Sequence, residues 1–212
     1  MAVAACLGIA AAGSAFAAAP SAQDTSFLQA AHQSNLAEIA VGELAQSKGT
    51  NQQVKELGAR FVADHTALDQ AVTATASALG VTLPDAPNAE QQAIAAQLEA
   101  AAPGREFDTA FVTTQLASHM ATMQAGETEL AEGSDPAAKK VAADAAPVVA
   151  SHMDALNDIA RALGVPSTVN GGDAGLAVRH ADAVPAWSML GAGMILVGLG
   201  AFWVIRRRPG TR

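Results

Sequence analysis

The chain has 212 residues, half of them apolar, with 4% aromatic residues and no tyrosine. This length allows one domain with additional segments at its ends, and a sequence rich in alanine but poor in strand-forming residues favours helices. All 20 acidic residues lie between Asp24 and Asp182, where there are only eight lysines and arginines, so this part has a net charge near −12. Such an acidic surface argues against nucleic acid or anionic lipid as a binding partner.

Residues 1–19 have the composition of a secretory signal peptide. A run of small and apolar residues fills this stretch, and the sequence then becomes polar. Both Ala15-Phe16-Ala17 and Ala17-Ala18-Ala19 match the small-residue pattern of a cleavage site. We therefore expect this segment to be removed during export. Cys6 would be lost with it, so the exported protein would contain no thiol and would depend on its core for stability.

Four long segments have the three-four spacing of apolar residues that is typical of amphipathic helices. Each is followed by a glycine, with proline soon after three of them. The predicted helices span residues 25–47, 51–79, 105–131 and 136–163. A shorter helix is predicted for residues 88–101, in the connection between the second and third long helices, where Asn88 and Gln91 fit an N-terminal capping box.

Short links join the first long helix to the second and the third to the fourth, which predicts two antiparallel hairpins. The simplest architecture for residues 24–164 is an all-α, up-down four-helix bundle. Residues 165–185 contain several glycines and show no periodicity, so we expect a linker.

Residues 186–205, AWSMLGAGMILVGLGAFWVI, carry no charge and are long enough to cross a bilayer as a helix. Trp187 and Trp203 lie near the ends of this segment, where indole rings favour the membrane interface. Three arginines begin the tail, residues 206–212, and mark the cytoplasmic side. We therefore expect a single-pass protein of the cell membrane, with the bundle on the extracytoplasmic side. Glycines in the span would permit close packing of two spans, but they do not define an oligomeric state.

Three histidines lie on the inward faces of three predicted helices. His65, His119 and His152 each take one step in a stripe of apolar residues with three-four spacing. Counting residues along the helices places all three near the middle of the bundle. In the first helix Glu38 lies at a comparable level and Glu43 about one turn further on, and we favour Glu38. Three imidazoles and a carboxylate would suit a first-row transition metal, since the interiors of helical bundles often hold such sites.

The alternative interpretation is that each histidine is a core residue, hydrogen-bonded to a neighbouring helix without any ligand. Burial of three polar rings without partners would cost roughly several kcal/mol, which weakens this alternative. We expect Asp64 on the flank of the second helix, where it would orient His65 or face solvent.

The sequence does not decide which metal would bind, and iron, zinc and copper remain open. Met120 and Met153 directly follow two of the histidines and Met123 is near, which is consistent with copper because a thioether is a soft ligand. Methionine is also an ordinary core residue. Haem is a weaker alternative because the sequence contains no haem-attachment cysteine motif.

Three segments resemble the DUF4142 family. Residues 37–69, AEIAVGELAQSKGTNQQVKELGARFVADHTALD, are similar to its opening helices. Residues 104–120, GREFDTAFVTTQLASHM, and 145–156, AAPVVASHMDAL, are similar to its later motifs, with Phe111 at a position that is usually tyrosine. The resemblance covers about residues 27–163. It implies a ferritin-like fold and an exported bacterial protein, but no established reaction.

No functional class is fixed by these observations. The doubled Glu-x-x-His motif of di-iron ferritins does not occur in the sequence, which argues against ferroxidase chemistry. No nucleophile with a base, phosphate-binding loop or redox pair points to an enzyme. We therefore expect a membrane-anchored extracytoplasmic module that binds a small ligand or an envelope protein. The alternative is a transition-metal-binding envelope protein that uses His65, His119, His152 and Glu38.

Overall fold

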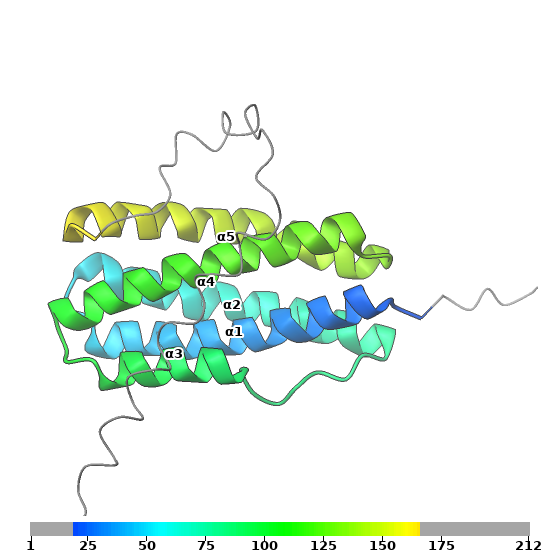
Figure 1. Cartoon of the computed structure of the whole chain (residues 1–212), viewed down its shortest axis with the longest axis horizontal. Helices are drawn as coiled ribbons and strands as arrows, with labels where there is room; N and C mark the ends of the chain where they lie inside the picture. Colours follow the sequence, from blue (N-terminus) through cyan, green and yellow to red (C-terminus); the bar gives the residue numbers. More distant parts are fainter. Residues whose placement is uncertain (1–18, 166–212) are drawn as a thin grey trace, which may run out of the picture. The chain divides into compact units, whose positions relative to one another are not determined.

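Five helices form the part of the chain that the structure, a computed structural model, describes, which is residues 19–165 (Figure 1). They are α1 (Ala22–Lys48), α2 (Gln52–Leu79), α3 (Ala89–Ala100), α4 (Arg105–Glu132) and α5 (Pro136–Leu163). Each predicted helix is present, with ends that differ by at most a few residues, and no strand occurs between residues 19 and 165. The prediction of an all-α bundle is confirmed.

The helix ends follow from the capping residues in the sequence. The side chains of Asn51 and Asp135 accept hydrogen bonds from backbone N–H groups in the first turns of α2 and α5. Asn88 and Gln91 form the predicted capping box at the start of α3. Gly80 and Gly164 end α2 and α5 in the left-handed conformation, with φ of 69° and 66°, which glycine adopts without steric cost.

Most of the predicted terminal segments lie outside the described residues. These are residues 1–18 of the predicted signal peptide, the linker after residue 165, the predicted span at residues 186–205 and the tail at 206–212. Within residues 19–165, no helix is both long enough and apolar enough to cross a membrane.

The connection between the two hairpins runs along the length of the bundle. α1 is antiparallel to α2, and α4 to α5, as the short links predict (Figure 1). Asp108, in the first turn of α4, accepts hydrogen bonds from the backbone N–H groups of Thr50 and Asn51, just before α2, at 3.1 and 2.9 Å. α2 and α4 therefore start at the same end and run parallel. The direction of α4 differs from the alternating up-down order because residues 80–104 first return the chain to the end where α2 began.

The two hairpins are related by an internal repeat. Asp24, in the first turn of α1, accepts hydrogen bonds from the backbone N–H groups of Ser134 and Asp135 at the start of α5, at 2.8 and 3.0 Å. Asp24 is thus the counterpart of Asp108, and the two are 84 positions apart (24 to 108). The same separation relates further residues along the hairpins, which are Phe27 and Phe111, Gly49 and Gly133, and Gly80 and Gly164.

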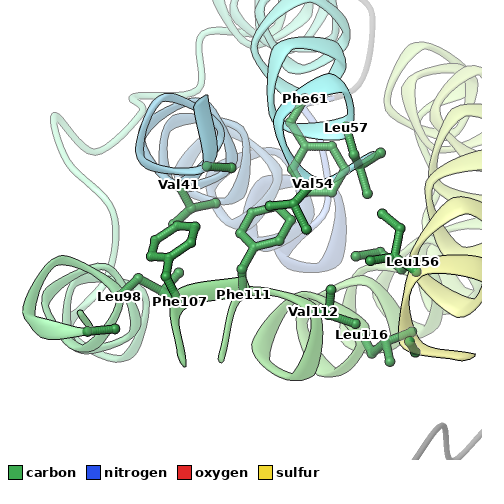
Figure 2. Close-up of a cluster of buried hydrophobic side chains, with 14 of the residues drawn as sticks. Val41, Val54, Leu57, Phe61, Leu98, Phe107, Phe111, Val112, Leu116 and Leu156 are labelled. Atoms are coloured by element: carbon green, nitrogen blue, oxygen red, sulfur yellow. The ribbon is translucent and has the colours of Figure 1, made fainter. Parts of the chain in front are cut away.

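Two apolar clusters stabilise the bundle. In the larger cluster, shown in Figure 2, the rings of Phe61 and Phe111 lie with centroids 5.7 Å apart, and those of Phe107 and Phe111 lie 6.1 Å apart. Leu98 of α3 packs into this cluster and is fully buried. The smaller cluster lies towards the start of α1 and the end of α2, and consists of Phe27, Leu28, Val72, Ala76, Ala138, Val141 and Ala142. The polar centre of the bundle lies between these clusters.

Candidate metal centre

Three histidines from three helices meet in the interior of the bundle. His65 of α2, His119 of α4 and His152 of α5 are 3%, 1% and 0% exposed, and one ring nitrogen from each lies within 4.8 Å of the others. Each histidine is near the midpoint of its helix, so the three levels match whichever way a helix runs. The unexpected direction of α4 therefore leaves the predicted cluster in place.

The ring of His65 is oriented by α1. Its Nδ1 lies 2.9 Å from the side-chain oxygen of Asn35, which is 6% exposed. An amide oxygen only accepts hydrogen bonds, so Nδ1 of His65 carries the hydrogen and donates it. The neutral ring then has a bare Nε2, and this buried nitrogen has no hydrogen-bond partner among the described residues.

The ring of His119 is oriented by its own helix. Its Nδ1 lies 3.0 Å from the backbone carbonyl oxygen of Gln115, one turn earlier in α4. Because the carbonyl accepts, Nδ1 of His119 carries the hydrogen. The Nε2 atom of the neutral ring is therefore bare, and it lies 3.3 Å from Nδ1 of His152.

The ring of His152 is oriented by α2. Its Nε2 lies 2.8 Å from Oδ2 of Asp64. An ionised carboxylate can only accept, so Nε2 of His152 donates and Nδ1 is bare. Arg60 donates to the same carboxylate at 3.2 Å and also to the hydroxyl of Ser151 on α5, at 2.9 Å. These bonds fix the position of the carboxylate beside the ring.

Asp64 differs from its predicted place as the partner of His65. It contacts His152 instead, and Asn35 takes the place beside His65. Consecutive residues project from an α-helix about 100° apart, since one turn takes 3.6 residues. His65 therefore reaches α1, whereas Asp64 reaches α5.

Glu38 lies behind His119, away from the point where the bare nitrogens meet. It is 4% exposed, and its Oε1 is 3.9 Å from Nδ1 of His119, the nitrogen that faces the backbone. The Gln115 amide faces this carboxyl group and, with its nitrogen turned inward, donates to both carboxyl oxygens at 2.9 and 2.7 Å. Burial raises the pKa of Glu38 to about 8. The three histidines form a potential metal-binding group to which Glu38 does not contribute an atom.

The interior of the cluster keeps the histidines neutral. Burial, followed by the proximity of the other rings, lowers the pKa of His65 to about 3. Burial and the charge of His152 lower the pKa of His119 to about 3, although the bond to Gln115 opposes this. Burial also lowers the pKa of His152, against the opposing effect of Asp64. Neutral imidazole is the form that binds a metal ion.

Phe61 belongs to the larger apolar cluster and packs directly against the histidines. Its ring centroid lies 4.9 Å from that of His119, 4.7 Å from that of His152 and 5.7 Å from that of His65. All three imidazoles thus share one aromatic neighbour, which holds their planes and excludes water from that side.

The remaining histidine and methionines of the described region lie apart from this site. His32 is paired with Asp69 through its Nδ1, at 2.7 Å. Met120 and Met123 are 44% and 38% exposed, so the thioethers proposed for a copper site lie at the surface. Met153 is 7% exposed and belongs to the larger apolar cluster.

The sequence-based prediction missed the residues that orient the rings. Asn35 is on the inward stripe of the first helix, and its polarity at that position is the signal for a buried partner. Gln115 is four residues before His119, and therefore on the same face of its helix. Asp64 orients His152, whereas the sequence predicts that it orients His65 or faces solvent.

Neither curated proteins nor solved structures give a match. One family model does match, over residues 10–159, and this covers more than half of the chain and all three histidines. The chain belongs to this family, which is described as a domain of unknown function (DUF4142).

Proposed function

We propose that this protein binds one first-row transition-metal ion through His65, His119 and His152. The observation that supports this most strongly is the direction of the outer hydrogen bonds. Each ring donates its one hydrogen away from the cluster, to Asn35, to the Gln115 carbonyl or to Asp64. Histidine ligands of metals are generally oriented in this way, with the second N–H held by a carboxylate, carbonyl or amide oxygen.

The spacing of two of the three bare nitrogens supports a metal more than a purely structural network. Nε2 of His119 and Nδ1 of His152 are 3.3 Å apart. Two nitrogens that bind one tetrahedral ion at about 2.0–2.1 Å are separated by roughly 3.3 Å. Without an ion, two lone pairs face each other at this distance. A hydrogen could lie between them if His152 changed tautomer and gave up its bond as donor to Asp64, or if His152 took up a second proton, which the lowering of its pKa by burial opposes.

The ligand chemistry favours zinc, copper or iron. Three imidazoles suit these ions, and a three-histidine set leaves a fourth position for water or another small ligand. The single crossover connection is also the topology of ferritin-like bundles, which supports the fold that the family resemblance implies. The proposed centre differs from a ferritin di-iron site, because its ligands are three histidines rather than a pair of Glu-x-x-His motifs.

Glu38 has an indirect role in this proposal. It lies on the far side of His119 and is held by Gln115, so it tunes that ring from outside the ligand set. With its raised pKa Glu38 holds a proton at neutral pH, and an incoming cation would favour the loss of this proton, so that the carboxylate compensates part of the charge. We expect Glu38→Gln to retain one metal ion per chain, whereas loss of the ion would show that Glu38 is the fourth ligand.

We also propose that the centre lies outside the cytoplasm, on a bundle tethered to the membrane. The support is the sequence of residues 1–19 and of residues 186–212. Fractionation of cells should find the chain in the membrane, with the bundle accessible to protease added from the extracytoplasmic side. A variant that lacks residues 186–212 should be released in soluble form. Its retention in the membrane would contradict the anchor.

Metal analysis of the purified protein tests the central proposal. The chelated protein is dialysed against Zn²⁺, Cu²⁺ or Co²⁺, and bound metal is measured by mass spectrometry, with the Co²⁺ absorption spectrum as a report on coordination. We expect one ion per chain, with tetrahedral Co²⁺ bands. The variants His65→Ala, His119→Ala and His152→Ala should lose it while keeping their helical circular dichroism. His32→Ala is the matched control and should bind normally. Equal binding by all four variants would contradict the proposal.

A further inference from the structure

A cavity of about 130 Å³ lies between α1, α2, α4 and α5, next to the histidine cluster. Apolar side chains line most of it, and the half-exposed Met123 and Leu130 lie where it meets the surface. His65 and Asn35 also line the cavity. An apolar cavity of about 150 Å³ in another protein is large enough to take up benzene. The volume here is therefore suited to a molecule with a single ring.

The internal repeat explains why the bundle is open at this place. At one pair of equivalent positions in the repeat, the first hairpin has Phe61 and the second hairpin has the much smaller Ala145, 84 positions later (61 to 145). A Cβ atom on Gly42 would lie only 2.7 Å from the backbone oxygen of Gly58, so α1 and α2 are in close contact there. A Cβ atom on Gly126, the counterpart of Gly42, would meet nothing within 4 Å. The second hairpin is thus less tightly packed beside the cavity.

The polar groups around the cavity restrict the charge of a ligand. Glu127 and Asp144 are among the lining residues, and no lysine or arginine is among them. A carboxylate or phosphate would therefore meet acidic groups without a compensating cation. Asn35 and His65 add little polar surface to the cavity, because Nε2 of His65 is itself buried.

We propose that this cavity binds a small uncharged molecule that consists largely of one apolar ring. This inference does not require the metal, because apolar contacts with the lining side chains would hold the ring. If the proposed metal binds as well, His65 links the two sites. Ligand and metal must then change each other's affinity by the same factor.

Phenol, toluene and benzoate are suitable probes, since they share one ring and differ in polarity and charge. The full chain, labelled with ¹³C in its methionine methyl groups, is placed in lipid nanodiscs, freed of metal by chelation and titrated with each probe. The methyl signal of Met123 should shift and saturate with phenol, and the signal of the exposed Met120 should not. Toluene should bind at least as tightly as phenol, and benzoate at least tenfold more weakly than phenol.

Ala145→Phe is the decisive variant, because it gives the second hairpin the residue that fills the first. It should abolish the phenol-dependent shift of Met123 while the helical signal and the metal content of the protein remain unchanged. Ala145→Leu, a smaller change, should weaken phenol binding at least fivefold and serves if the phenylalanine variant does not fold. Phenol binding that is unaffected in a folded variant would overturn the proposal, as would the absence of a saturable shift. Tighter binding of benzoate than of phenol would overturn the assignment of an uncharged ligand.

Discussion

Nε2 of His119 lies 3.3 Å from Nδ1 of His152, and neither nitrogen carries a hydrogen when both rings are neutral and their outer bonds are intact. This contact makes the two outer acceptors important for the site. The Gln115 carbonyl belongs to the helix backbone and is difficult to change by mutation. Asp64, in contrast, is a side chain on α2, so it can be replaced while all three histidines are kept.

Asp64→Asn should weaken metal binding about 10- to 100-fold, because an amide can donate to Nε2 of His152 and so move the ring hydrogen to the inner nitrogen. The measurement is a competition titration with a chromophoric chelator. Asp69→Asn, which alters the acceptor of His32 in the same helix, is the matched control and should have no effect on affinity. Equal affinities in the two variants would show that the tautomer of His152 does not depend on Asp64.

Glu129 should make the stability of the fold depend on pH. It is 0% exposed, and burial raises its pKa to about 7, with the hydrogen bond to Gln23 opposing and the nearby Asp24 adding to this rise. A raised carboxyl pKa means that the folded state holds the proton more tightly than the unfolded chain. Its stabilising effect is therefore complete below about pH 4.5 and is lost as the pH rises through about 7.

The matched measurement is urea unfolding of the wild type and of Glu129→Gln at pH 5, 6, 7 and 8. The free energy of unfolding of the variant relative to the wild type should rise by about 1–3 kcal/mol between pH 5 and pH 8. The difference between the two proteins is the quantity to follow. Other groups make the stability of both proteins depend on pH, namely Glu38, with its raised pKa, and His65 and His119, with lowered pKa values. Their effects cancel in the difference. A difference that does not change with pH would contradict the assignment.

Asp24 and Asp108 should contribute similarly to stability, because they occupy equivalent positions in the repeat. Each is at most 2% exposed and accepts hydrogen bonds from two backbone N–H groups at the start of another helix. Asp108→Ala leaves both donors unpaired and should reduce the free energy of unfolding by about 2–4 kcal/mol. Asp24→Ala should have an effect of similar size. Asp158→Ala, at an exposed position on α5, should change stability by less than about 0.5 kcal/mol.

The ends of the helices could be predicted from the sequence because they depend on local chemistry. Gly80, Gly164 and the pair Asn88–Gln91 act within one turn of the chain, and the structure confirms their roles. The direction of α4 depends instead on how residues 80–104 cross the bundle. Their length allows a return to either end, so short-range patterns do not determine it.

The site shows the same division between local and long-range information. The inward position of His65 follows from helix periodicity, and its level follows from counting residues. The choice between Asn35 and Asp64 as its partner depends on how far each helix is rotated about its axis, which is set by packing of the whole bundle. The cavity lies where the second hairpin departs from the repeat. The repeat itself is evident from Asp24 and Asp108, which have equivalent positions at the two ends of the bundle.

Gly42 and Gly126 should respond to the same substitution in opposite ways. A methyl group at Gly42 would lie 2.7 Å from the backbone oxygen of Gly58 and 3.1 Å from Cβ of Phe61, so Gly42→Ala forces α1 and α2 apart and should cost about 1–3 kcal/mol of stability. Gly126→Ala meets no atom within 4 Å and should add up to about 1 kcal/mol, because alanine is a better helix former than glycine. Thermal unfolding of both variants tests this contrast. Since Phe61 contacts all three imidazoles, Gly42→Ala should also weaken metal binding, whereas Gly126→Ala should leave it unchanged. Two variants with equal stability would show that the hairpins do not differ in packing.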